Sequence, residues 1–199
     1  CVTQIITTTT EPLVMAEALW GLGDEQRANS AFRTAVRVHP DDPVPRSRWG
    51  RLFASTHQAA DAESLYREAL QLDPSHVEAL TGLAELATLQ FDSRAEEYVR
   101  RALAIDPGNP DAIMLLSRLH LEANETIEAG QLLEPLIDTA KTLEVRLQAL
   151  ALMASAAHID GTPPDEWVDR ALSLAPAFGD IHAVPAYYYV ITRRYRESV

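Results

Sequence analysis

The sequence predicts an all-α fold built from repeated helix pairs, and two observations carry this prediction. The 199 residues include 30 Ala and 8 Gly. That composition favours helices, since Ala is the strongest helix former, whereas strands prefer β-branched and aromatic residues. A similar segment also recurs every 33 to 35 residues, which is the length of a helix-turn-helix unit in several repeat architectures.

The recurring segment is a helix with small residues along one face, followed by a proline. Ala is followed four residues later by an aromatic residue or Val. A second Ala comes three residues after that, and Pro follows five residues later. The first three of these positions share one face of a helix, so they predict a second helix that packs closely against a first. The clear copies are Ala28, Phe32, Ala35 and Pro40; Ala62, Tyr66, Ala69 and Pro74; and Ala95, Val99, Ala102 and Pro107.

A first helix is expected before each small-residue stripe, over residues 13–22, 45–55, 77–89 and 110–123. Gly23 and Asn124 fall where the chain must reverse, and both residue types tolerate the left-handed conformation that ends a helix. The third copy is one residue short, which places a deletion in the turn at residues 90–93. The fourth copy has Leu136 in place of Ala and lacks the final proline, so we expect a longer or tilted exit.

The last part of the chain departs further from the pattern. Residues 157–164 predict a long, mobile connection in which Thr162 caps the next helix, Pro163 and Pro164 begin it and Asp165 closes a capping box. A final helix is expected over residues 180–194, bent at Pro185.

These residues resemble the tetratricopeptide repeat family. Trp49-Gly50 with Phe53 matches the large-small-aromatic signature of the family's first helix, and Gly23 with Ala28 matches its turn glycine and its small second-helix residue. The resemblance implies an all-α, right-handed α-solenoid of helix-turn-helix repeats. The expected units are 9–42, 43–75, 76–108, 109–143 and 144–178, with a tail or tether at 1–8 and a final helix at 179–199.

The same resemblance implies a non-catalytic protein-interaction scaffold that binds a partner peptide or helix in the concave groove lined by the first helices. Trp20 and the arginines are expected to contribute most of the affinity. The residues expected to line the groove are Leu13, Glu17, Trp20, Ser47, Arg51, Ala54, Glu78, Thr81, Glu85, Met114, Arg118 and Leu121.

Two subtypes of the family do not match this chain. The clamp for chaperone tails needs a Lys and Asn set on the first helices, and the matching positions hold other residue types. Where the glycosyltransferase-associated arrays carry a ladder of asparagines, the repeating position holds Glu17, Arg51, Glu85, Arg118 and Leu152.

Charge and motifs exclude several functions. The net charge of −12 opposes binding to the phosphates of a nucleic acid, so nucleic acid is not expected as a partner. Neutral or basic protein segments are the expected partners, and their binding should weaken as salt is added. The six histidines are scattered and have no Cys partner, so neither a metal site nor a cofactor is expected. Nucleophile-elbow and phosphate-loop motifs are absent, so the segment is predicted not to be an enzyme.

Two alternatives stay open. Cys1 is the first and only cysteine, and bacterial lipoproteins carry their lipid on an initial cysteine. The chain could thus be an outer-membrane lipoprotein that assists assembly of a pilus or secretion machine, with Cys1 lipidated. The ending at Val199, where a second helix is due, instead suggests the regulatory repeat arm of a larger enzyme. Cytoplasmic and periplasmic locations both remain open.

Overall fold

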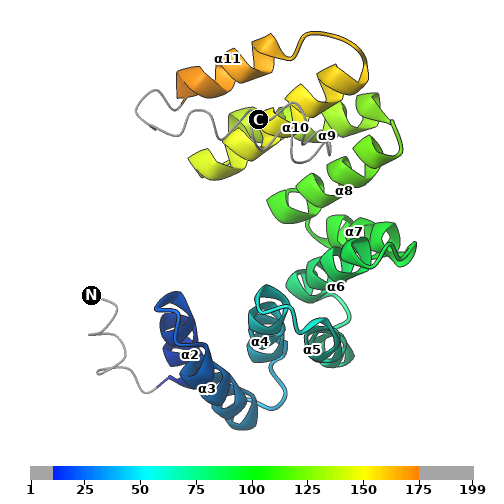
Figure 1. Cartoon of the computed structure of the whole chain (residues 1–199). Coiled ribbons are helices and arrows are strands. Elements are labelled where there is room, and N and C mark those ends of the chain that lie inside the picture. The colour runs from blue at the N-terminus through cyan, green and yellow to red at the C-terminus, as the bar shows by residue number, and fades with distance from the viewer. Residues whose placement is uncertain (1–10, 175–199) are drawn as a thin grey trace. The chain divides into compact units, whose positions relative to one another are not determined.

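The computed structural model describes residues 11–174, and within that range its regular structure is entirely helical. The helices follow one another as antiparallel pairs joined by short turns (Figure 1). In chain order they are α2 (Pro12–Gly21), α3 (Glu25–Val38), α4 (Pro43–Ser55), α5 (Ala59–Leu72), α6 (Val77–Leu89), α7 (Arg94–Ile105), α8 (Pro110–Glu122), α9 (Thr126–Thr139), α10 (Leu143–Ile159) and α11 (Asp165–Leu174).

The chain divides into two compact units, one ending at Asp106 and the other beginning at Pro107. Unit 1 contains α2 to α7, and unit 2 contains α8 to α11 among its described residues. In unit 1 each first helix packs on the second helix of its pair, and α4 also contacts α6 directly. In unit 2, α8 contacts both α9 and α10. Successive first helices contact each other directly at α4 and α6 in unit 1 and at α8 and α10 in unit 2.

The small-residue stripes lie in the core, as the sequence predicts. Ala28, Phe32 and Ala35 on α3 are fully buried, and the matching residues of α5 and α7 are at most 3% exposed. An alanine at a helix crossing lets the two backbones approach closely, and the larger residue between the alanines fills the space beside them. The stripe therefore holds α3 between α2 and α4, and α5 between α4 and α6.

The turn between the two helices of each pair contains one residue in the left-handed conformation. These residues are Gly23, His57, Phe91, Asn124 and Gly161, with φ between 56° and 77°. In each case the next residue donates its N–H to a carbonyl five residues earlier, for example Asp24 to Leu19 at 3.0 Å. This is the C-terminal bond of a Schellman motif, and it satisfies a carbonyl that the helix leaves free.

The short third repeat is confirmed, and its turn shows how the deletion is accommodated. At the start of the other second helices, Ala28, Ala62 and Ala129 each donate to a carbonyl four residues earlier. Ala95 instead donates to Asp92, three residues earlier, at 3.1 Å. One tighter turn thus absorbs the missing residue and still places the small-residue stripe of α7 in the core.

The structure corrects two expectations at the later repeats. Helix α10 continues to Ile159, so the connection to α11 is shorter than predicted. The Thr162 hydroxyl donates to the carbonyl of Ala157 at 2.9 Å, so it closes the end of α10 and does not cap α11. Pro163 and Pro164 do not begin α11 either, because its first residue is Asp165. The exit from α9 is not longer, because α9 ends at Thr139 and α10 begins at Leu143; the tilted form of that expectation stays a prediction. The expected tail, the final helix with Pro185 and Cys1 all lie outside the described residues.

One aromatic side chain joins three helices of unit 1. Tyr66 of α5 is 2% exposed, and its ring lies against Gly50 of α4 and Gly82 of α6. A Cβ added to Gly50 would come within 2.9 Å of the ring, and one added to Gly82 within 2.3 Å. Both glycines are needed because only the absence of a side chain leaves room for the ring.

We predict that Gly82→Ala destabilises the protein by about 1 to 3 kcal/mol, the usual cost of forcing extra volume into a packed core. Thermal and urea unfolding of the variant and the wild type measure this loss of stability. Gly21→Ala is the matched control, since a Cβ there meets nothing within 4 Å. Adding Tyr66→Leu to Gly82→Ala should recover part of the loss by removing the ring. Equal unfolding midpoints for the two alanine variants would contradict this packing.

Candidate functional site

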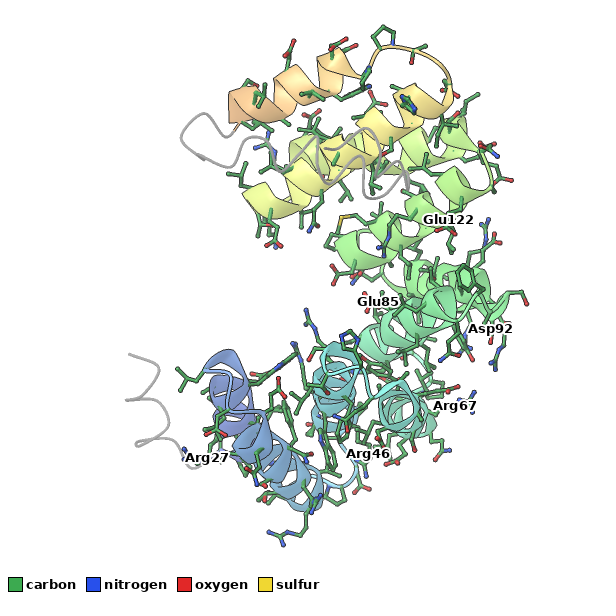
Figure 2. All side chains as sticks on the ribbon, viewed as in Figure 1. Arg27, Arg46, Arg67, Glu85, Asp92 and Glu122 are labelled. Atoms are coloured by element: carbon green, nitrogen blue, oxygen red, sulfur yellow. The ribbon has the colours of Figure 1, made fainter. Side chains whose placement is uncertain are left out.

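The candidate site is the surface formed by α2, α4 and α6, which we call the first-helix face of unit 1. Nine of the twelve residues expected to line a groove belong to these helices, and the other three belong to α8 in unit 2. In unit 1, Glu17, Arg51 and Glu85 are exposed. Figure 2 shows Glu85 on the opposite side of unit 1 from Arg67 of α5.

The remaining predicted residues are partly or fully buried. Half-buried positions are occupied by Leu13, Trp20, Ala54, Glu78, Met114 and Arg118. Trp20 and Leu13 pack against the core cluster around Phe32. Ser47, Thr81 and Leu121 are only 0%, 7% and 5% exposed, so their expected exposure to a partner was wrong.

The burial of the two hydroxyl residues follows from their position. Ser47 and Thr81 lie on α4 and α6, which contact each other directly. Each hydroxyl donates to a backbone carbonyl of its own helix, that of Val44 for Ser47 and that of Val77 for Thr81. Their hydrogen-bonding needs are therefore met inside the helix, and the small side chains are suited to close packing.

An ionic network connects the three helices of the face. Arg48 of α4 lies between two carboxylates, with its Nε 3.6 Å from Glu17 of α2 and 3.2 Å from Glu78 of α6. Arg51 extends further outward, and its ionic contact with Glu78 is longer, at 3.9 Å. The Arg48 side chain is 38% exposed and that of Arg51 is 56% exposed. Arg48 is thus mainly an internal link, and Arg51 is accessible.

Sequence reasoning identified Arg51 but missed Arg48. The two arginines are three residues apart, a spacing that places side chains on the same helix face. That spacing could have indicated that Arg48 lies on the same face as Arg51. The ion pair joins Arg48 Nε to Glu78 Oε2. Arg48 Nε and the other carboxylate oxygen, Glu78 Oε1, are buried without a hydrogen-bond partner, so the pairing is ionic and incompletely satisfied.

A serine, a histidine and a glutamate also meet beneath this network. The Nε2 of His76 lies 2.9 Å from the Ser47 hydroxyl, which lies 3.2 Å from Glu78 Oε2. A catalytic triad requires the carboxylate to orient the histidine and the serine to be accessible. Here the carboxylate contacts the serine, and Ser47 is fully buried. The arrangement therefore connects α4 to α6 and has no accessible nucleophile.

Tyr66 reaches this face from the core. Burial raises the pKa of its phenol, and the nearby carboxylates of Glu85 and Glu78 raise that pKa further, while Arg51 lowers it. The phenol is therefore held neutral, and its charged surroundings are those of the first-helix face.

Other parts of the described chain provide weaker candidates for a binding site. A hollow of about 260 Å³ lies between α3 and α4, and another of about 300 Å³ lies on α5; these volumes are at or below the smallest typical small-molecule sites. Among residues 11–174 no group of three His, Cys, Asp or Glu is arranged to hold a metal ion. No helix in that range is both long and apolar enough to span a bilayer.

Over residues 11–174 the fold and the face are those of a helical-repeat protein that presents helix surfaces to solvent. Two tetratricopeptide repeat family models match the chain, one over residues 47–110 and the other over residues 93–156. The chain belongs to the tetratricopeptide repeat family. Its fold is accordingly an all-α solenoid of helix-turn-helix repeats.

Individual proteins resemble the chain over different extents. The peroxisomal targeting signal receptor of Kluyveromyces lactis is 36% identical over 80 residues, which is 37% of this chain and 14% of the receptor. This chain thus spans only a small part of that relative. The solved structure of PilW, a type IV pilus biogenesis factor, has a TM-score of 0.73 at 21% identity and covers 92% of this chain and 87% of PilW. YrrB, a repeat protein with an unusual peptide-binding site, has a TM-score of 0.62 at 13% identity, covering 94% and 98%.

The different environments of the two arginines lead to a stability prediction. Arg48→Met should lower the free energy of unfolding by about 1 to 2 kcal/mol, because it keeps the apolar stem and leaves the partly buried Glu78 without its nearest cation. Arg51→Met should leave it unchanged within about 0.5 kcal/mol, as for most exposed residues. Urea unfolding of both variants tests this, and a larger loss for Arg51→Met would contradict it.

The raised pKa of Tyr66 predicts a loss of stability in alkali. A phenol whose pKa is higher in the folded protein than its ordinary value of 10.0 favours the unfolded state increasingly once the pH passes that value, because the unfolded chain then releases a proton that the folded chain retains. Tyr66→Phe, which cannot ionise, should therefore lose less stability than the wild type between about pH 9 and pH 11. Identical slopes of unfolding free energy against pH would refute this.

Proposed function

We propose that this chain is a non-catalytic interaction scaffold whose first-helix face in unit 1 binds a segment of a protein partner. The observation that carries the proposal is the exposed, charged surface running across α2, α4 and α6, with Arg51 extending from its centre. Mixed charges and a partly buried aromatic residue, Trp20, suit a segment that combines apolar and ionic contacts.

The relatives support the same class of function. The name of the peroxisomal receptor describes recognition of a targeting signal, and YrrB is a repeat protein with a peptide-binding site. The tetratricopeptide fold is typically an interaction module. The likeness to PilW, at 21% identity, concerns the fold, and no described residue of this chain favours a role in pilus assembly. A regulatory role within a larger enzyme likewise has no described residue in its favour.

The test begins with peptides selected from a displayed random library against the purified chain. Trp20→Ala and Arg51→Ala should each weaken binding of a selected peptide by about 1 to 3 kcal/mol, as anchors at an interface do. Calorimetry measures the affinity, and circular dichroism melts show whether each variant stays folded. Higher salt should weaken binding modestly.

Arg67→Ala and Arg100→Ala are the matched controls. These residues lie on the second helices α5 and α7, are about as exposed as Arg51, and pair with Glu63 and Glu96 of their own helices at 2.6 Å and 2.7 Å. If either control weakened binding more than Trp20→Ala and Arg51→Ala do, the first-helix face would not be the binding surface.

A further inference from the structure

The first-helix face carries charges that alternate from one repeat to the next. Glu17, Arg51 and Glu85 are separated by 34 residues each, so they occupy the same position on α2, α4 and α6. All three are exposed. The order along the face is therefore negative, positive, negative. We call these three residues the charge ladder.

Two other ionic groups of the face, Arg48 and Glu78, pair with each other and also approach Glu17 and Arg51. Arg48 and Glu78 are 3.2 Å apart, and both are less exposed than the ladder residues near them. Arg48 also approaches Glu17, but at 3.6 Å, and the Glu17 side chain remains 42% exposed. The ladder position differs from that of Arg48 and Glu78 because it carries an exposed, charged side chain on each of α2, α4 and α6.

Helix geometry sets the spacing of a complementary partner. Helices α4 and α6 contact each other directly, and packed helices lie about 8 to 10 Å apart, whereas an extended chain covers about 3.3 Å per residue. One repeat of this face therefore corresponds to about three residues of an extended segment. Every third residue of such a segment would therefore lie opposite the charge on the next helix.

We propose that the first-helix face selects an extended partner segment with basic, acidic and basic residues at positions i, i+3 and i+6. The inference rests on the proposed function and adds the chemistry of the partner. The basic residues pair with Glu17 and Glu85, and the acidic residue pairs with Arg51. This charge pattern is the same in both chain directions, so it does not depend on which way the segment lies.

The test compares two blocked, fluorescent heptapeptides of identical composition. One carries Lys, Glu and Lys at positions 1, 4 and 7, and the other carries Lys, Lys and Glu there, with Leu and Ala between. Their equal net charge removes the general attraction of an acidic protein for a basic peptide. The wild-type chain should bind the first peptide about tenfold more tightly at low salt, because two contacts change from attractive to repulsive in the second. The preference should shrink as salt is added.

A charge-neutral swap in the protein provides the matched variant. Arg51→Glu combined with Glu85→Arg reorders the ladder without changing the net charge, so it should reverse the preference toward the Lys, Lys, Glu peptide. Circular dichroism melts monitor folding of the double variant. Arg67→Glu combined with Glu63→Arg reorders a pair on α5 and should leave the preference unchanged.

The outcomes separate the two proposals. Equal wild-type affinity for both peptides, with binding of both weakened by Trp20→Ala, would overturn the charge ladder and leave the first-helix face as a peptide site. Absence of binding to either heptapeptide, while a library-selected peptide still binds and is weakened by Trp20→Ala and Arg51→Ala, would overturn the charge ladder alone. Binding that no substitution on the face changes would overturn both proposals. Reversal of the preference in the swapped variant supports the charge ladder.

Discussion

The seating of the Tyr66 ring between Gly50 and Gly82 is the contact on which the arrangement of unit 1 depends. A repeat of two helices cannot bury its own apolar surface, so its stability comes from the neighbouring pairs. The ring belongs to one second helix and fills space on the first helices of two successive repeats. It thereby determines how closely α4 and α6 approach, and that approach is what turns separate helices into a continuous face.

The same contact influences the chemistry of the surface. Close approach of α4 and α6 buries Ser47 and brings Glu78 within reach of both Arg48 and the Ser47 hydroxyl. The phenol of Tyr66 adds a neutral polar group beneath the carboxylates, because burial and those carboxylates together keep it protonated. Arg51 lies one turn beyond the crowded part of α4 and so remains accessible. Packing thus separates internal ionic groups from those available to a partner.

Much of the fold could be predicted from the sequence because a repeat supplies its own comparison. The small-residue stripes, the first-helix ranges and the shortened third turn all follow from aligning the chain with itself. The same alignment could have located the left-handed residues His57 and Phe91, which follow Gly23 at intervals of 34 residues, but neither residue type suggests that conformation. Thr162 was misassigned because a threonine before prolines has the local pattern of a helix start, whereas tertiary context extended α10 beyond its expected end.

The site was harder to predict because helical position alone does not distinguish an exposed residue from a buried one. Ser47 and Arg51 occupy first-helix positions four residues apart, and their environments differ because α6 covers one and leaves the other exposed. That distinction depends on how adjacent repeats approach each other, which the residues of a single repeat do not specify. Glu17, Arg51 and Glu85 retain exposure at one repeating position, so the repeat that organises the core also spaces charge on the surface. Selectivity can then come from the order of charges along the face, with the shared helical framework unchanged.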